Sequence, residues 1–432
     1  MITPTPRSFP FEANSPMSLS GFSTPTGDCS SPFSGTSTPA TERSVLFDED
    51  FDTQFQPQPP SSNDYILVVG GLGYIGSHTS WELLRAGRNV IIIDNLSNCD
   101  RSTLSHLHSL TNNHFKGSAT KPTLDFYETD YRDQMVMRTL LGKYQNTSPS
   151  HAGPPFVPRS KIAGVIHFAA YKAVGESFQK PLQYYANNVG GMVDFCSTLS
   201  DFDIKTFVFS SSATVYGELA NQGGRLVETQ CDNTGCTGLT NPYGRTKWMC
   251  EAILHDLAVS DPDWTIMALR YFNPIGCDES GLLGENPRDV PNNLMPIVVQ
   301  AMTGERPALN IFGTDWDTPD GTAIRDFIHV SDLAAGHLAA LKATKRSNFT
   351  TGYHVYNLGT GTGHSVMEIV TAMQNVSGRT IPTKLSGRRE GDVGICIAEP
   401  SKSAASLDWK TRKSLTQACW DICRYLGYVS TK

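Results

Sequence analysis

Ser212, Tyr243 and Lys247 are the residues of this sequence whose types and spacing point most directly to chemistry. Tyr243 and Lys247 form a Tyr-x-x-x-Lys motif in NPYGRTKW, and Ser212 closes the earlier apolar run TFVFSSS. A phenol with an ordinary pKa of about 10 is a poor base near neutrality, but a nearby ammonium favours its phenolate form. The three side chains therefore predict proton transfer to and from an alcohol, with Tyr243 as the base.

The elements around these residues indicate how they meet. Asn241 and Pro242 are typical of a helix cap and first turn, which places Tyr243 and Lys247 one turn apart on one helical face. Ser212 stands at the carboxyl end of an apolar strand, where open parallel sheets bind ligands. A Tyr-x-x-x-Lys pair alone also fits an ordinary surface helix. The prediction of a catalytic site therefore depends on what else lies at that edge of the sheet.

A glycine-rich turn supplies the second feature. Gly70, Gly71, Gly73 and Gly76 stand between the apolar run YILVV and the helical pattern SHTSWELL. Such a turn lets the backbone approach a pyrophosphate at a helix amino terminus, and Asp94 at the end of NVIIID suits ribose hydroxyls. Because its carboxylate repels a 2'-phosphate, the sequence predicts NAD rather than NADP. A glycine turn that only packs would leave Asp94 without a role.

Together the two features predict a nicotinamide-dependent reaction. An oxidised nicotinamide carries a positive charge, which further favours the phenolate of Tyr243. With Ser212 holding the reacting oxygen, removal of hydride from an alcohol carbon is the natural chemistry of this arrangement.

Short apolar runs that alternate with helical patterns predict an α/β fold. From Asp64 on, the pattern is typical of a doubly wound, Rossmann-like parallel sheet covered on both faces; the runs are YILVVG, NVIIIDN, IAGVIHFAA, TFVFSSSA and TIMALRYFN. Two polar inserts, Thr111–Lys121 and Gln145–Ser160, are predicted to be surface loops. After Asn273 the strand signals become fewer, which predicts a smaller C-terminal substrate-binding domain.

Three regions follow from these patterns. Residues 1–62 are rich in Ser, Thr and Pro without apolar periodicity, so we expect a disordered tail. Residues 63–272 are predicted to form the NAD-binding Rossmann domain. Residues 273–432 are predicted to form mainly the substrate-binding domain, with some segments returning to the Rossmann domain.

Composition narrows the class of partner. The chain has 432 residues and a formal net charge of -7, without a basic run for nucleic acid or an apolar stretch near the roughly 18 residues that span a membrane. Its start has no basic flank leading into an apolar segment, so we expect a cytoplasmic protein that binds a small molecule. The cysteines lack zinc spacing, and DWDTPDG departs from a calcium loop at Pro319 and Asp320. We expect buried free thiols and no metal.

Further stretches match known motifs in order along the chain: GGLGYIGSHT, HFAAYKAVGES, QKPLQYYANNV, FSSSATVYG, RYFNPIG, PNNLMP, IRDFIHVSDLA, YNLGTG and RREGD. From about Tyr65 to its end, the sequence resembles the extended short-chain dehydrogenase/reductase family, and within it the UDP-glucose 4-epimerases. The resemblance implies reversible C4 epimerisation of UDP-glucose and UDP-galactose through a 4-keto sugar, with tightly bound NAD, as a step of galactose metabolism. It also implies a homodimer that uses helices of the nucleotide domain.

The resemblance assigns cofactor contacts motif by motif. The glycine turn and the strand end after it supply Gly70, Gly73, Tyr74, Ile75, Gly76 and Asp94, followed by Asn95, Leu96, Ser97, Asn98 and Cys99. An acid and an apolar residue are expected beside adenine, at Asp130 and Tyr131. The remaining contacts are Phe168, Ala169, Lys172, Asn188 and Phe272, with Ser212, Tyr243 and Lys247 at the nicotinamide.

Substrate contacts are assigned in the same way. Those expected along the sugar and uridine are Lys172, Ser212, Tyr243, Asn273, Asn293, Leu294, Asn310, Ile311 and Phe312. Arg325 and Arg389 suit the diphosphate because a guanidinium fork neutralises and orients phosphate oxygens, and Asp392 suits a ribose hydroxyl. Either arginine in isolation would also fit a surface or interdomain ion pair.

Some positions depart from the family pattern. Val69, Ala170, Arg245 and Thr246 replace the usual residues without touching a reacting group. Cys396 occupies a position where family members with a bulky Tyr tend to exclude N-acetyl sugars. Because its small thiol leaves room, UDP-GlcNAc and UDP-GalNAc are predicted to be interconverted as well.

Two other functions compete with this one. A nucleotide-sugar 4,6-dehydratase would need carboxylates just after the serine, where Ala213 and Thr214 stand. A sensor that only binds NAD and a sugar would not need an intact set of Ser, Tyr and Lys. His167 and His329 each end an apolar run and are predicted to be satisfied core histidines rather than bases.

Overall fold

The structure, a computed structural model, describes residues 64–146, 159–232, 235–288, 291, 293–389 and 391–428. The predicted disordered tail, residues 1–62, and residues 147–158 of the second polar insert lie outside the described residues. Within the described part of the chain, no helix is long and apolar enough to cross a membrane.

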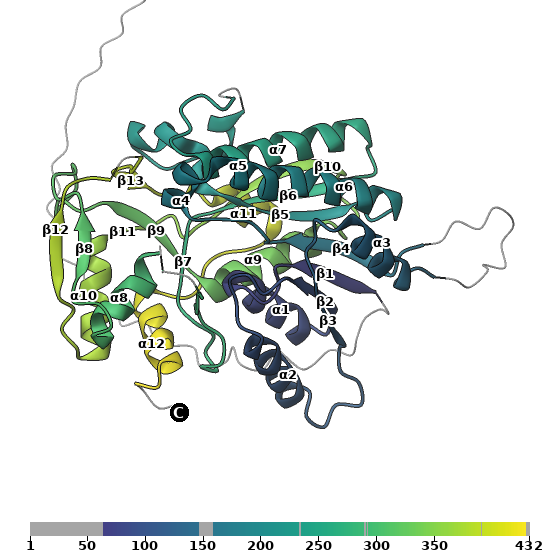
Figure 1. Ribbon diagram of the computed structural model, residues 1–432, viewed down its shortest axis with the longest axis horizontal. Helices are drawn as coiled ribbons and strands as arrows, with labels where there is room; N and C mark the ends of the chain where they lie inside the picture. The colour runs from purple at the N-terminus through teal and green to yellow at the C-terminus, as the bar shows by residue number, and fades with distance from the viewer. Residues whose placement is uncertain are drawn as a thin grey trace, which may run out of the picture. The chain divides into compact units, whose positions relative to one another are not determined.

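A seven-stranded parallel sheet forms the centre of the fold (Figure 1). Its strand order is β10-β6-β5-β4-β1-β2-β3, and each neighbouring pair is parallel. Five of the strands coincide with the predicted apolar runs, because a sheet covered on both faces buries consecutive side chains. The strands are β1 (Tyr65–Val69), β2 (Asn89–Asp94), β3 (Leu124–Glu128), β4 (Ile162–His167), β5 (Thr206–Ser212), β6 (Thr265–Tyr271) and β10 (Gly352–Leu358).

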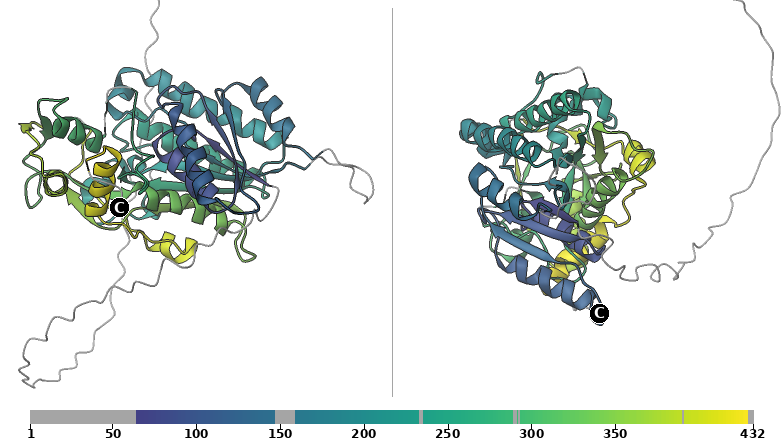
Figure 2. Two further views of the ribbon diagram at one scale, coloured as in Figure 1. Left: turned by 90° about the horizontal axis from the view of Figure 1, so that it is seen from below. Right: turned by 90° about the vertical axis from the view of Figure 1, so that its right-hand side faces the viewer.

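Helices cover both faces of this sheet, as the turned views of Figure 2 also show. One face packs against α1 (Tyr74–Arg85), α2 (Ser102–His114) and α9 (Val330–Ala343). The other face packs against α3 (Gln134–Lys143), α6 (Gly191–Asp201) and α7 (Pro242–Ser260). Between β4 and α6, the chain forms three short helical elements: α4 (Val174–Gln179), α5 (Pro181–Tyr184) and η1 (Tyr185–Gly190).

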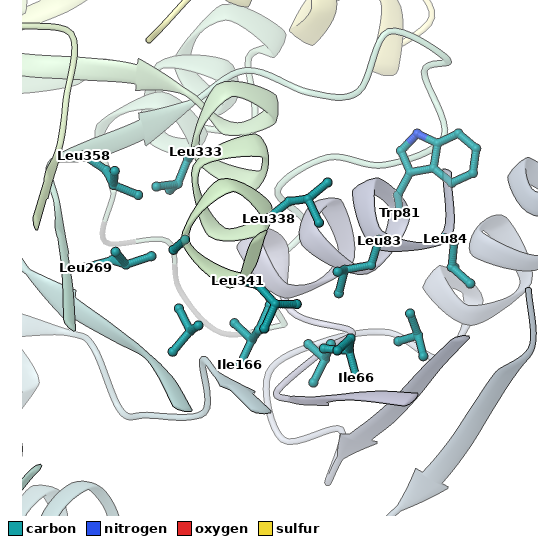
Figure 3. Packing of buried hydrophobic residues seen from close by; sticks show 14 of the residues in the cluster. Ile66, Trp81, Leu83, Leu84, Ile166, Leu269, Leu333, Leu338, Leu341 and Leu358 are labelled. Atoms are coloured by element: carbon teal, nitrogen blue, oxygen red, sulfur yellow. The ribbon is translucent and has the colours of Figure 1, made fainter. Parts of the chain in front are cut away.

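Leucine side chains hold the first of these faces together (Figure 3). Leu83 of α1 and Leu341 of α9 point towards Ile66 and Ile166 of the sheet, and all four are almost fully buried. Each such side chain contributes about 1.5–3 kcal/mol of burial free energy. Buried apolar side chains therefore hold β1 and β4 against α1 and α9.

The C-terminal part builds two small sheets and returns twice to the large one. β7 (Asn273–Ile275), β9 (Ile324–His329), β11 (Gly363–Ser365) and β13 (Ile395–Cys396) form one sheet, and β8 (Leu309–Phe312) pairs with β12 (Thr383–Ser386). The helices of this part are α8 (Leu294–Thr303), α10 (Val366–Ser377), α11 (Ser401–Leu407) and α12 (Leu415–Tyr425). The predicted α/β class is confirmed: β10 pairs with β6 in the large sheet, and α9 packs against that sheet. The domain boundary after residue 272 stays a prediction.

Two expectations about loops and thiols need correction. The first insert is partly helical: α2 runs to His114, and Thr111 is buried and donates its hydroxyl to the Leu107 carbonyl. Leu107 and Leu110 give that segment an apolar face, which its polar neighbours concealed. Among the described cysteines all are free thiols, but Cys236 is exposed rather than buried.

Candidate active site

The glycine turn brings the backbone of β1 against the start of α1. Gly70 adopts a φ of +77°, which favours glycine, and a Cβ there would lie 2.9 Å from the Ala169 nitrogen. A Cβ on Gly76 would lie 2.1 Å from the Gly70 carbonyl oxygen. No side chain caps α1, so its first-turn N–H groups face the turn. This backbone cradle fits the pyrophosphate of a dinucleotide.

Asp94 links that turn to the segment after β2. Its carboxylate accepts hydrogen bonds from the Leu72 and Leu96 backbone nitrogens, each at 3.0 Å, and from the Cys99 thiol at 3.2 Å. Leu96 takes a left-handed conformation with φ of 56°. Asp94 therefore shapes the segment that carries the predicted contacts Asn95 to Cys99, and its role towards a ribose stays a prediction.

Other predicted cofactor residues lie on neighbouring strand ends. The Asn95 amide donates to Asp130 at 3.2 Å, and the Tyr131 hydroxyl donates to the Asn187 carbonyl at 2.6 Å. Ala169, just after β4, donates its backbone N–H to Val69 at the end of β1. The structure thus gathers these residues at the carboxyl edge of the parallel sheet.

Two more cofactor candidates connect this edge to other elements. The Asn188 amide donates to the Tyr171 carbonyl and to the Thr246 hydroxyl on α7, each at 3.0 Å. The Lys172 ammonium lies 3.7 Å from Glu285 in the segment before α8. Asn188 therefore fixes α7 against the cofactor side, whereas Lys172 remains about half exposed.

The candidate catalytic residues meet where β5 ends and α7 begins. The Asn241 side chain caps α7 by accepting from the Gly244 nitrogen at 2.8 Å, and Pro242 is the first helical residue, as predicted. Tyr243, Lys247 and Ser212 are all buried. The Lys247 ammonium donates to the Ser210 carbonyl at 2.6 Å and lies 6.0 Å from the Tyr243 ring centroid.

Burial dominates the electrostatics of this group. It raises the pKa of Tyr243 to about 12, although a hydrogen bond with Ser212 lowers it. Burial lowers the pKa of Lys247 to about 8, partly offset by the nearby Cys250 and Glu251. Within the protein chain, burial outweighs the hydrogen bond that favours the Tyr243 phenolate. The positive charge expected of an oxidised nicotinamide would favour the phenolate further.

Two predicted substrate residues lie side by side on adjacent strands. Arg325 of β9 and Cys396 of β13 are register partners. Burial lowers the pKa of Arg325, whose guanidinium donates to the carbonyls of Ile324 at 2.9 Å and Gly394 at 3.3 Å. Cys396 packs in a buried cluster with Phe272 and with Val215 and Tyr216, which follow Ser212 in η2 (Ala213–Gln222). This cluster connects the strand of Cys396 to the catalytic end of β5.

A second group of substrate candidates lies near β8. The Arg389 guanidinium lies 4.7 Å from the Phe312 ring centroid, and its Nε donates to Asp392 at 2.9 Å. Asn310 is exposed, but Ile311 is buried in the core of the C-terminal part, which leaves only its backbone for a ligand. The other candidates lie on separate elements: Asn273 is exposed on β7, and Leu294 begins α8.

Several residues beside the candidates were missed by sequence reasoning. Glu251 and Arg270 form a buried ion pair at 2.7 Å, four positions after Lys247 and at the end of β6. An arginine inside the apolar run TIMALRYFN was a signal of a buried partner. Glu285 accepts from the Asn293 amide at 2.6 Å and thereby joins Asn293 to Lys172. Its sequence context carried no comparable signal.

The two histidines that were predicted to lie in the core differ from each other. His329 is satisfied as predicted, because its Nδ1 accepts from the Ser331 nitrogen at 3.1 Å and its Nε2 donates to Asp421 at 3.1 Å. For His167 the prediction is wrong: it is buried, but neither ring nitrogen has a hydrogen-bond partner within the described residues. Burial, with Lys247 nearby, lowers the pKa of His167 to about 3, so it stays neutral. The described residues contain no cluster that could hold a metal ion.

Comparisons with known proteins agree with the resemblance found in the sequence motifs. The model of the NAD dependent epimerase/dehydratase family matches residues 66–359. The sequence is 42% identical to UDP-glucose 4-epimerase of Bacillus subtilis, over 83% of this chain and 96% of that protein. Two solved structures are also similar. That of UDP-glucose 4-epimerase from Bifidobacterium longum with NAD+ and UDP has 39% identity, covers 84% of this chain and 98% of its own, and gives a TM-score of 0.73. That of the UDP-Glc/GlcNAc 4-epimerase from Campylobacter jejuni has 33% identity, the same coverage and a TM-score of 0.65.

Proposed function

Because the chain belongs to the NAD dependent epimerase/dehydratase family, we infer that it is an isomerase that interconverts UDP-glucose and UDP-galactose at carbon 4 with bound NAD. The observation that carries this inference is the buried group of Ser212, Tyr243 and Lys247 at the sheet edge where the glycine turn also ends. NAD supplies a hydride acceptor and donor when it is bound there.

The cofactor would be held by the backbone of the glycine turn and by residues at neighbouring strand ends. Gly70 and Gly76 let the turn pack closely against α1 and the neighbouring strand end, since a Cβ on either would strike backbone atoms, and the backbone N–H groups at the start of α1 would hold the pyrophosphate. Asp94 would accept from ribose hydroxyls while keeping its bonds to the turn. Asp130 and Tyr131 would flank adenine, and Phe168, Lys172, Asn188 and Phe272 complete the proposed set.

The three catalytic side chains divide the proton chemistry. Ser212 would hold the 4-hydroxyl oxygen of the hexose, and the Tyr243 phenolate would accept its proton. The Lys247 ammonium, anchored on the Ser210 carbonyl, stabilises that phenolate by charge. After the 4-keto sugar has turned over, Tyr243 returns the proton to the 4-oxygen and the inverted sugar is released.

This reaction requires a firmly held nucleotide and a loosely held sugar. Arg325 and Arg389 would bind the diphosphate, and Phe312 with Asn310 would bind the uridine. Asn293, held by Glu285, lies at the start of α8, where it would contact the phosphate or sugar. Asp392 would accept from the uridine ribose.

N-acetylated substrates form part of this proposal. Cys396 is small and sits in the cluster that adjoins η2, so an acetamido group finds more space there than beside a tyrosine. The similarity to the UDP-Glc/GlcNAc 4-epimerase of Campylobacter jejuni supports this reading. We therefore extend the substrate class to UDP-GlcNAc and UDP-GalNAc.

A homodimer and a cytoplasmic location complete the proposal. Phe178, Leu182 and Val193 expose large apolar side chains on α4, α5 and α6 in the Rossmann half, which suits a subunit contact. Size-exclusion chromatography with light scattering tests the dimer, and imaging of the tagged full chain tests the location.

The competing reactions are separated by one incubation. Thr214, where a dehydratase would need a carboxylate, instead donates its hydroxyl to Ser212 at 3.0 Å. Purified protein is incubated with UDP-galactose, and the nucleotide sugars are separated on a column. We expect UDP-glucose; a 4-keto-6-deoxy sugar would indicate a dehydratase, and unchanged UDP-galactose would indicate a binding protein.

A further inference from the structure

Three residues of α7 share one face and meet three consecutive serines of β5. Tyr243, Lys247 and Glu251 recur every four positions, so their side chains lie along one side of the helix. Lys247 donates to the Ser210 carbonyl at 2.6 Å, the Ser211 hydroxyl donates to Glu251, and Ser212 bonds with Tyr243. Each serine therefore holds one residue of this face, and Glu251 is the member without an assigned role.

Glu251 is held more completely than either catalytic neighbour. Arg270 of β6 grips it with two nitrogens, Nη2 to Oε2 at 2.7 Å and Nε to Oε1 at 3.0 Å. The Tyr353 hydroxyl of β10 donates to it at 3.2 Å. The side chains of Glu251 and Arg270 are only 6% and 5% exposed. This network therefore fixes α7 against β5, β6 and β10 at one point.

The same arginine reaches the segment that follows Ser212. Arg270 Nη1 donates to the Glu228 carbonyl at 3.0 Å and to the Tyr216 hydroxyl at 3.3 Å. Tyr216 lies in η2, directly downstream of Ser212, and packs with Phe272 and Cys396. One ion pair is thereby connected to both elements that supply catalytic side chains.

A buried ion pair of this kind is weak evidence for stability, because desolvation offsets much of its attraction. Its directional bonds do, however, fix the register and rotation of a helix, which apolar packing alone fixes less sharply. Resting on the proposed roles of Tyr243 and Lys247, we propose that Glu251, paired with Arg270 and Ser211, is a positioning residue that sets the α7 face against the catalytic end of β5.

The charge of Glu251 also acts on Lys247. The groups that face Lys247 are Tyr243, Cys250 and Glu251 on α7 itself and His167 from β4, with Ser210 and Phe209 of β5 below it. His167 is neutral, and of these groups Cys250 and Glu251 raise the pKa of Lys247, with Glu251 as the carboxylate of the set. Removing it lowers the pKa of Lys247 and weakens Tyr243 as a base at alkaline pH.

The test compares the full-length parent with Ser211→Ala, with Glu251→Gln and with Glu251→Met combined with Arg270→Met. The double change removes both charges and so avoids leaving one buried without a partner. Asp332→Asn is the matched control: Asp332 is also buried and accepts from the Arg412 and Lys413 nitrogens, but it lies on α9. Bound NAD, thermal midpoint, kcat, KM for UDP-galactose and the pH profile of kcat are measured for each protein.

We expect kcat to fall about 10–100-fold in Glu251→Gln and in the double variant, as for an ångström-scale misplacement, and several-fold in Ser211→Ala. KM and NAD content should stay close to those of the parent. In Glu251→Gln the alkaline loss of kcat should begin about one pH unit lower. Asp332→Asn should lose thermal stability while keeping the parent kcat.

The inference is overturned if the double variant recovers the parent kcat, because the pair would then serve stability only. It is also overturned if Glu251→Gln keeps the parent kcat and pH profile. If Glu251→Gln does not fold, the inference is overturned when Ser211→Ala and the double variant both show the kcat of the parent. Full activity of Tyr243→Phe would refute the proposed function together with this inference, whereas an inactive Tyr243→Phe beside fully active Glu251 variants refutes the inference alone.

Discussion

Gly76→Ala should weaken binding of the cofactor while leaving the fold intact. The added Cβ would lie 2.1 Å from the Gly70 carbonyl oxygen and 2.9 Å from the Gly71 Cα, and both obstacles are backbone atoms that cannot rotate away. Restoring an ordinary contact of about 3.2 Å requires the turn and α1 to separate by roughly 1 Å. Such overpacking costs about 1–3 kcal/mol.

If that strain is relieved by opening the turn, it appears as lost cofactor affinity. At 1.4 kcal/mol per factor of ten, about 1–3 kcal/mol corresponds to NAD binding weakened by roughly 5- to 150-fold. The assay is the NAD content of the purified protein together with titration of cofactor-stripped protein by calorimetry. A parallel thermal melt shows whether the fold survives.

Gly142→Ala is the matched control for this change. Gly142 lies in α3 with nothing within 4 Å of an added Cβ, so alanine there should keep NAD binding and add up to about 1 kcal/mol of stability. If Gly76→Ala binds NAD as tightly as the parent and Gly142→Ala, the glycine turn is not the pyrophosphate cradle and the reasoning is refuted.

Three further predictions concern other parts of the site. Burial lowers the pKa of Lys247 from 10.5 to about 8. The charged side chain therefore destabilises the folded protein below pH 8, and this cost fades as the pH rises from 8 to 10.5. At about 1.4 kcal/mol per pKa unit, Lys247→Met should be about 3 kcal/mol more stable than the parent at pH 7 in chemical denaturation, yet inactive. A less stable Lys247→Met would contradict this sign. In a product assay, Cys396→Tyr should abolish turnover of UDP-GlcNAc and spare turnover of UDP-galactose. Equal loss of both activities would count against the size argument. So would a parent protein and a Cys396→Ala variant that both turn over UDP-glucose and UDP-galactose but neither N-acetylated sugar. Arg325→Ala should raise the dissociation constant of UDP about 10- to 100-fold in calorimetry, as expected for hydrogen bonds to a charged group, and unchanged binding would remove Arg325 from the diphosphate site.

The sequence predicts the large sheet well because its strands are uniform apolar runs. YILVV carries no charged residue, and NVIIID is wholly apolar between its terminal Asn89 and Asp94, a pattern typical of a strand covered on both faces. β3, with the sequence LDFYE, was not predicted, because as an edge strand it stays partly exposed and carries charges. The place of β10 beside β6 depends on a contact between residues far apart in the chain, which no local pattern contains.

The same distinction holds for the candidate site. The Asn241 cap and the glycine turn are local chemistry and follow from a few adjacent residues. The pairing of Glu251 with Arg270 is tertiary, and so is the burial that raises the pKa of Tyr243 against the direction expected from its motif. Spacing identified which side chains meet, but not how deeply they are buried.

The measurement that tests the central claim most directly is the conversion of UDP-galactose to UDP-glucose by the parent protein and by Tyr243→Phe, with bound NAD quantified in both. Loss of a general base typically lowers the rate about 10²- to 10⁴-fold. We expect that loss in Tyr243→Phe with an unchanged NAD content. Equal rates of inversion in the two proteins would show that the phenol does not carry the proton, and would contradict the account.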